Sequence, residues 1–95
     1  MRVHWTDTAV EHLLSIYEYI AQDSPVYAQR MIDRLTRRSE QIATFLLSRR
    51  MVPEYEADDI REMIEKPYRI IYRIKPDQVD ILAAVHSAQM LSSKL

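Results

Sequence analysis

The side chains that could do chemistry in this sequence are cations and an imidazole grouped around one short stretch, residues 68–75. With period two, Arg69, Ile71, Arg73 and Lys75 would point to one side of a strand, and Tyr68, Ile70, Tyr72 and Ile74 to the other. Arg61 and His86, on the flanking strands, are expected to share this open, basic face. Guanidinium and imidazole groups bind anions well. The stretch therefore predicts a strand with one buried face and one face able to hold an acidic segment or an RNA phosphate.

Composition excludes several other chemistries. The chain has no cysteine, which rules out thiolate chemistry and disulfides, and no glycine, which argues against glycine-dependent phosphate loops. The three histidines are scattered without ligand spacing, so neither a metal nor a cofactor is expected. A formal net charge of −1 argues against direct DNA binding. No apolar run is long enough to span a bilayer and no leader precedes the domain, so we expect a cytoplasmic protein that does not bind membranes.

The elements that must position these side chains form a single domain, residues 1–95. Residues 2–5 are predicted to form a strand, and the polar side chains that follow can cap an amphipathic helix ending near Gln22. Ser24 and Pro25 suit the start of a second helix, whose apolar stripe continues to Leu46. The short link between the two helices predicts an antiparallel hairpin.

Three more strands are expected after a loop at 48–59, at residues 60–64, 68–75 and 79–85. In the last hairpin one register pairs apolar with apolar and cation with anion. This register sets Ile74 opposite Val79, Tyr72 opposite Ile81, Ile70 opposite Ala83, Arg73 opposite Asp80 and Ile71 opposite Leu82. The predicted fold is α+β with two layers, β-α-α-β-β-β: a helical hairpin packed on one face of a mainly antiparallel four-stranded sheet.

The loop before the central strand decides which residues share the open face. If residues 65–67 form this loop, Arg61 and Met63 join Arg69 on the open face, and Glu62 points toward the helices. An inward charge of this kind is tolerable on an edge strand, where it discourages aggregation.

The second helix carries a basic stripe on its polar side. It is either a solvated face, partly offset by a pair between Asp33 and Arg37, or a docking stripe for an acidic partner. Its members are Arg30, Arg34, Arg37 and Arg38.

Several segments together resemble a known family. They are a Trp-containing first strand, the pattern Ala-x-x-x-Leu-x-x-Ile-x-x-Tyr-Ile at 9–20, Ser-Pro at 24–25, Arg-Met-Val-Pro-Glu at 50–54, Ile-Arg-Glu at 60–62, residues 68–74 and Val-His at 85–86. Their order and spacing resemble the RelE/ParE superfamily of toxins from type II toxin–antitoxin systems, nearer the ParE branch. The resemblance covers almost the whole chain.

The resemblance implies a growth-inhibiting toxin of the plasmid-stabilization kind, held inactive by a cognate antitoxin in a toxin–antitoxin hetero-oligomer. ParE-like members bind and inhibit DNA gyrase, and this is the function we expect. A binding toxin needs a surface rather than a catalytic site, so enzymatic activity is not expected. The candidate partner-binding residues are Arg30, Arg34, Arg37, Arg38, Arg61, Arg69, Arg73, His86, Met90 and Leu91.

Two alternatives stay open. RelE-like members cleave mRNA on the ribosome, and here Glu54 would be the base, His86 the acid, and Arg61 with Arg69 the stabilisers of phosphorane charge. A non-toxic relative is the other alternative. Arg49 stands where such families commonly have Gly, and Gln89 stands where they often have Arg.

Overall fold

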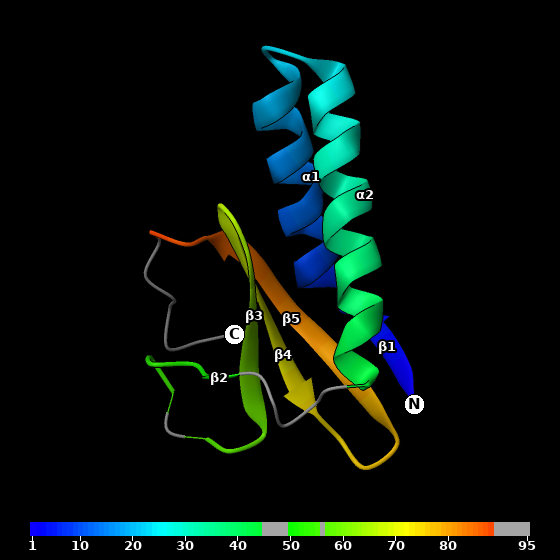
Figure 1. Ribbon diagram of the computed structural model, residues 1–95, viewed down its shortest axis with the longest axis vertical. Coiled ribbons are helices and arrows are strands. Elements are labelled where there is room, and N and C mark those ends of the chain that lie inside the picture. Colours follow the sequence, from blue (N-terminus) through cyan, green and yellow to red (C-terminus); the bar gives the residue numbers. More distant parts are fainter. Residues whose placement is uncertain (45–49, 56, 89–95) are drawn as a thin grey trace.

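The computed structural model describes residues 1–44, 50–55 and 57–88, which form one helical hairpin and one sheet (Figure 1). The elements are β1 (Arg2–Trp5), α1 (Asp7–Ala21), α2 (Pro25–Ser39), the 3₁₀ helix η1 (Glu40–Ala43), β2 (Arg50–Met51), β3 (Ile60–Glu65), β4 (Tyr68–Ile74) and β5 (Gln78–His86). No helix in the described part of the chain is both long and apolar enough to span a membrane.

Both helices begin at side-chain caps. The Thr6 hydroxyl oxygen accepts a hydrogen bond from the Ala9 amide at 3.2 Å, and the same hydroxyl donates to the Ile81 carbonyl at 2.7 Å. This pair of bonds fixes the corner between β1 and α1 against β5. The Ser24 hydroxyl caps α2, as the sequence predicts.

The second helix is shorter than its apolar stripe predicts. It ends at Ser39 and continues as η1 to Ala43, while residues 45–49 lie outside the described chain. Ser39 is buried, donates to the Thr36 carbonyl at 2.7 Å and accepts from the Trp5 indole at 3.2 Å. The end of α2 is therefore tied to β1.

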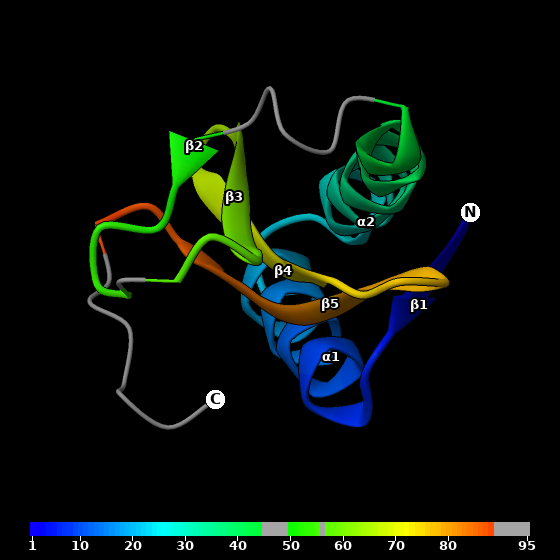
Figure 2. The ribbon, with the colours of Figure 1, turned by 90° about the horizontal axis from the view of Figure 1, so that it is seen from below.

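The sheet has the order β1-β5-β4-β3-β2, with β1 parallel to β5 and the other pairs antiparallel. Figure 2 shows β1 and β2 at opposite ends of this sheet, with β4 and β5 between them. The predicted α+β fold is confirmed. The structure adds β2 to the predicted strands, an edge strand of two residues.

Two apolar clusters cover the two faces of the sheet. On the helix face, Ile70, Tyr72 and Ile81 pack against both helices through Ile16 and Leu35. The other face, which we call the outer face, carries a separate cluster. It consists of Val52, Ile60, Ile71, Ala83 and Val85, with Tyr55 and Ala57 packed against them. The face predicted to be open is therefore covered in part by Val52, Tyr55 and Ala57.

A β-bulge changes the predicted register of β4 and β5. Tyr72 pairs with Ile81 as predicted, but Ile71 pairs with Ala83 rather than with Leu82, and the register shifts at this point. One extra residue in a strand reverses the faces of every residue beyond it. The prediction that His86 lies on the open face is therefore wrong, and His86 lies on the helix face.

The loop between β3 and β4 is also shorter than predicted. Glu65 pairs directly with Tyr68, so the loop contains two residues rather than three. This reverses β3: Met63 packs in the helix-side core, and Glu62 lies on the outer face opposite Ile71. Arg61 lies on the helix face for the same reason. The prediction of a basic cluster on one face is therefore wrong for Arg61 and His86.

Candidate functional site

Arg69 is the centre of a buried ion-pair network on the outer face. Its Nε donates to Glu62 Oε2 at 2.7 Å, while Nη1 and Nη2 donate to the two oxygens of Glu54 at 2.9 and 2.8 Å. The exposed fractions of the side chains are 6% for Arg69, 0% for Glu62 and 15% for Glu54. The guanidinium is thus held by two carboxylates, one of them in the bidentate geometry that is favourable for Arg.

Two local features bring these carboxylates together. The two-residue loop between β3 and β4 sets the parity of β3, so Glu62 points to the same face as Arg69. Glu54 comes from the segment after β2, where Val52 is buried in the outer-face cluster and the Tyr55 amide donates to the Val52 carbonyl at 3.0 Å. This turn holds Glu54 over the sheet.

The network fixes Arg69 as a permanent cation. The hydrogen bond to Glu54, with the bond to Glu62 and the charges of both carboxylates, holds the pKa of Arg69 above its usual value in spite of burial. Such an arginine cannot exchange a proton near neutral pH. Its arrangement serves to compensate buried charge and to fasten the 52–55 segment to β4.

The residues proposed for RNA cleavage do not form one site in this structure. Glu54 and Arg69 are in contact on the outer face. Arg61 lies on the helix face, where its Nε donates to the Asp58 carbonyl at 2.9 Å. His86 also lies on that face, at the end of β5.

Arg73 is the one other predicted cation that the outer face keeps. It pairs with Ile60 across the sheet, and its Nε lies 3.4 Å from the Asp59 carboxylate. About half of each side chain is exposed, so the pair is open to solvent and to partners.

His86 lines a cavity of about 560 Å³ between α1 and the ends of β4 and β5. The His86 and Tyr68 rings pack edge to face with their centroids 5.9 Å apart, and the Nδ1 of His86 accepts a hydrogen bond from the Ala88 amide. His12, on α1, accepts from the Ala84 amide at 3.1 Å and joins the helix to β5. Burial, together with nearby Tyr19, raises the pKa of Tyr68. Sequence reasoning missed His12, although it precedes buried Ile16 by one helical turn.

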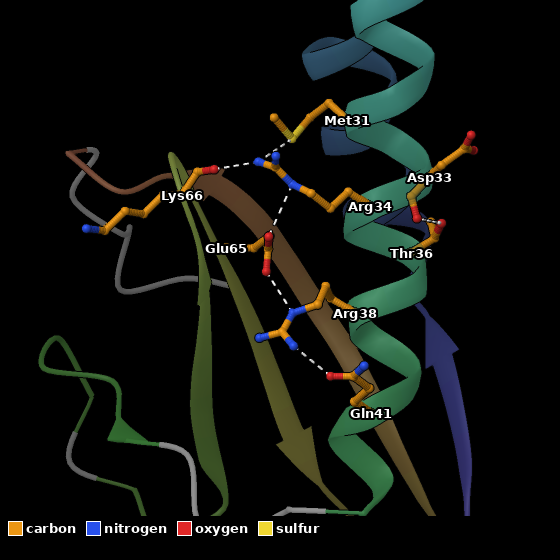
Figure 3. Close-up of polar contacts among 8 residues, drawn as sticks. All are labelled: Met31, Asp33, Arg34, Thr36, Arg38, Gln41, Glu65 and Lys66. Atoms are coloured by element: carbon orange, nitrogen blue, oxygen red, sulfur yellow. Dashed lines mark hydrogen bonds and ion pairs between the residues drawn. The ribbon is translucent and has the colours of Figure 1, made fainter.

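The basic stripe of α2 is divided in the structure. Arg34 and Arg38 both turn toward the β3–β4 loop, where their Nε atoms lie 3.1 and 2.7 Å from the carboxylate of Glu65 (Figure 3). Arg34 also donates to the Lys66 carbonyl at 2.6 Å, and Arg38 to Gln41 at 2.7 Å. These two arginines fasten α2 to the sheet.

The other two arginines of the stripe do not contact the loop between β3 and β4. Arg30 lies over the ring of Tyr27, 5.7 Å from its centroid, and Arg37 is exposed. Asp33, predicted to pair with Arg37, instead accepts a hydrogen bond from Gln29 at 2.9 Å.

Some predicted positions cannot be placed. Met90 and Leu91, together with the two departures at Arg49 and Gln89, lie outside the described residues. Within residues 1–44, 50–55 and 57–88, no group of His and acidic side chains is arranged to hold a metal ion.

The sequence matches one family and is similar to two named toxins. Residues 3–91 match the family described as the ParE toxin of the type II toxin–antitoxin system parDE. Over 90 residues the chain is 32% identical to Toxin RelE2 of Caulobacter vibrioides, covering 94% of this chain and 98% of that protein. It is 33% identical over 90 residues to Putative toxin Y4kP of Sinorhizobium fredii, covering 93% and 90%.

Two solved structures share the fold. A chain of the chromosomal ParDE TA system from P. aeruginosa superposes with a TM-score of 0.75 at 21% identity, and one of the YoeB dimer from Staphylococcus aureus with 0.60 at 12%. Each comparison covers 90% of this chain and 95% of the other, and at these identities it shows the fold alone. Because the family match spans nearly the whole sequence, the chain belongs to the ParE toxin family of type II toxin–antitoxin systems, within the RelE/ParE superfamily.

Proposed function

We propose that this chain is a toxin that binds and inhibits DNA gyrase and is neutralised by a cognate antitoxin, without catalysing a reaction. Membership of the ParE toxin family supports the toxin and antitoxin parts of this proposal. Both similar proteins carry toxin names, and the ParDE structure comes from a toxin–antitoxin system. A cytoplasmic location follows from the proposal, because gyrase acts on DNA in the cytoplasm.

The closed network around Arg69 is the observation that favours binding over RNA cleavage. A ribonuclease needs a base, an acid and cations that converge on one phosphate. Here both oxygens of Glu54 are bonded to Arg69, and Arg69 is almost fully buried. Arg61 and His86 lie on the opposite face of the sheet. In this arrangement the four groups do not surround a common substrate position.

The exposed cations are the candidates for contacts with acidic protein segments. Arg30 and Arg37 on α2 and Arg73 on β4 are exposed. Each could pair with a carboxylate of the antitoxin or of gyrase at the rim of an interface, where such pairs affect association rate and specificity.

The proposal is tested by separating the two modes of toxicity. Expression without antitoxin should slow growth and induce a DNA-damage reporter, and the purified chain should inhibit supercoiling by gyrase. Co-expression of the cognate antitoxin should restore growth. The competing hypothesis predicts ribosome-dependent mRNA cleavage, lost in Arg61→Ala and His86→Ala, with gyrase unaffected. That result would refute the proposal.

A further inference from the structure

The cavity beside His86 takes no part in the Arg69 network. It lies on the helix face of the sheet, between α1 and the ends of β4 and β5, whereas Arg69 lies on the outer face. Its volume of about 560 Å³ is within the range of about 300–1,000 Å³ that is typical of small-molecule sites. Two of its lining residues, Ile16 and Ala84, belong to the helix-side core. The fold itself therefore fixes part of the cavity wall.

Two histidines line the cavity, and each uses the same ring nitrogen to accept a hydrogen bond from the backbone. Nδ1 of His12 accepts from the Ala84 amide at 3.1 Å, and Nδ1 of His86 accepts from the Ala88 amide at 3.2 Å. A neutral imidazole has one donor and one acceptor nitrogen, so a ring that accepts at Nδ1 carries its proton on Nε2. Both rings therefore offer an N–H donor as their remaining polar group.

Hydroxyl groups and aromatic rings make up much of the remaining lining. Tyr68 is buried, and burial, with a smaller contribution from Tyr19, raises the pKa of Tyr68 above its usual value. Its hydroxyl is therefore protonated at neutral pH. Ser15 and Tyr19 add two more hydroxyls from α1. The Tyr68 and His86 rings pack edge to face, and flat aromatic molecules pack favourably against such rings.

The described residues that line the cavity include no Lys, Arg, Asp or Glu. A charged ligand would lose its hydration there without gaining a countercharge, which disfavours nucleotides and other phosphate compounds. Apolar side chains of a partner protein are disfavoured for another reason, because they would bury the donors of His12 and His86 without acceptors. The lining thus favours an uncharged molecule that carries hydrogen-bond acceptors.

We propose that this cavity binds an uncharged, planar heteroaromatic small molecule whose acceptor atoms bond to the Nε2–H groups of His12 and His86. Such a ligand bridges α1 and β5, since His12 belongs to the helix and His86 to the strand. Because it binds only the folded chain, it also stabilises the chain against unfolding. This site is independent of gyrase and of the antitoxin, so the assays of the proposed function do not bear on it.

The test uses bicyclic probes of similar size that differ in hydrogen bonding and charge. Quinoxaline has two ring-nitrogen acceptors and no donor, whereas indole has an N–H donor and no ring-nitrogen acceptor. Quinoxaline should bind the full chain with a Kd on the order of 1 mM, which is usual for a fragment of this size. Indole should bind at least about fivefold more weakly, because its N–H meets donors in the cavity. Quinoxaline-2-carboxylate should also bind more weakly than quinoxaline, and tighter binding of the carboxylate would refute an uncharged ligand.

NMR spectroscopy locates the bound probe, because the chain has three histidines and one of them, His4, is not among the lining residues. Titration with quinoxaline should shift the imidazole signals of His12 and His86. The signals of His4, an exposed residue of β1, should stay in place. Equal affinity for quinoxaline and indole, or shifts no larger at His12 and His86 than at His4, would overturn the inference.

His86→Phe removes one N–H donor and keeps a ring against Tyr68. It should weaken quinoxaline binding about threefold to tenfold, the usual effect of one hydrogen bond, and should not weaken indole binding. His4→Phe is the matched control and should leave both affinities within about twofold of those of the unmodified chain. Equal losses in the two variants, or quinoxaline binding that His86→Phe leaves unchanged, would contradict the assignment. Circular dichroism checks that both variants fold, and the comparison of the probes on the unmodified chain is decisive without them.

Discussion

Replacement of Arg69 by Ala is the substitution with the largest expected effect on stability. It would leave Glu62, whose side chain is fully buried, without its 2.7 Å partner, and would release Glu54 from both of its bonds to the guanidinium. Breaking a buried pair from one side typically costs about 3–5 kcal/mol, because an uncompensated charge stays inside the protein. A 95-residue domain has a total unfolding free energy of about 5–14 kcal/mol.

Urea unfolding followed by circular dichroism measures this loss directly. Thermal unfolding gives a second readout of the same loss. A destabilisation of 1 kcal/mol lowers the unfolding midpoint of a domain of this size by about 4–8 °C, so a loss of about 3 kcal/mol should lower it by at least about 12 °C. Arg73→Ala is the matched control, since that arginine lies on the same strand but its ion pair is half exposed. The control should cost no more than about 1 kcal/mol.

The same variants can contradict the structural role of the network. If Arg69→Ala loses no more stability than Arg73→Ala, Arg69 does not compensate buried charge. The reasoning then fails. A double-mutant cycle with Glu62→Gln adds a check, because the two losses should be strongly non-additive if the side chains are in contact.

Three smaller effects are expected. Hydrogen bonding to Lys75 lowers the pKa of Asp80, so Asp80→Asn should reduce the unfolding free energy at neutral pH. The difference in unfolding free energy between this variant and the unmodified chain should shrink as the pH falls below the usual carboxyl range toward the lowered pKa. Glu65→Gln weakens two partly exposed ion pairs and should cost about 1 kcal/mol or less in urea unfolding. Ser39→Ala removes the acceptor of the Trp5 indole and should cost about 1–3 kcal/mol by the same measurement.

Exposed positions supply controls for these three variants. Asp77→Asn should show little pH-dependent difference, and Arg37→Gln should leave stability nearly unchanged, since both side chains are exposed. A pH-independent loss in Asp80→Asn would contradict the linkage argument. A loss in Glu65→Gln as large as that in Arg69→Ala would show that the contact in Figure 3 is stronger than its exposure implies.

The order of elements and half of the last hairpin could be predicted from the sequence, because the signals there are strong. Ser24 and Pro25 are typical of a helix start, and both are used as such. Around Tyr72 and Arg73 apolar and charged residues alternate, and only one register satisfies both faces. Prediction succeeded where a wrong register would have buried a charge.

The bulge could not be predicted, because the pattern it interrupts has no alternation. Residues 81–85 are all apolar, so a shift of the register by one residue would still place apolar side chains on both faces of the sheet. The position of His86 depends on that one extra residue.

The buried network was missed for a different reason. Burial of Glu62 alone is costly, so the sequence favours an edge position for this residue. The contact with Arg69 compensates the buried charge of Glu62, and that contact depends on the two-residue loop between β3 and β4. The sequence shows the charges of Glu62 and Arg69, but it does not show the length of the β3–β4 loop, which brings the two side chains to the same face.

Supercoiling by purified gyrase in the presence of this chain is the most direct test of the central claim. We expect inhibition that increases with toxin concentration and is abolished by an equimolar amount of the cognate antitoxin. Undiminished supercoiling, together with mRNA cleavage on ribosomes that is lost in Arg61→Ala or His86→Ala, would contradict the account.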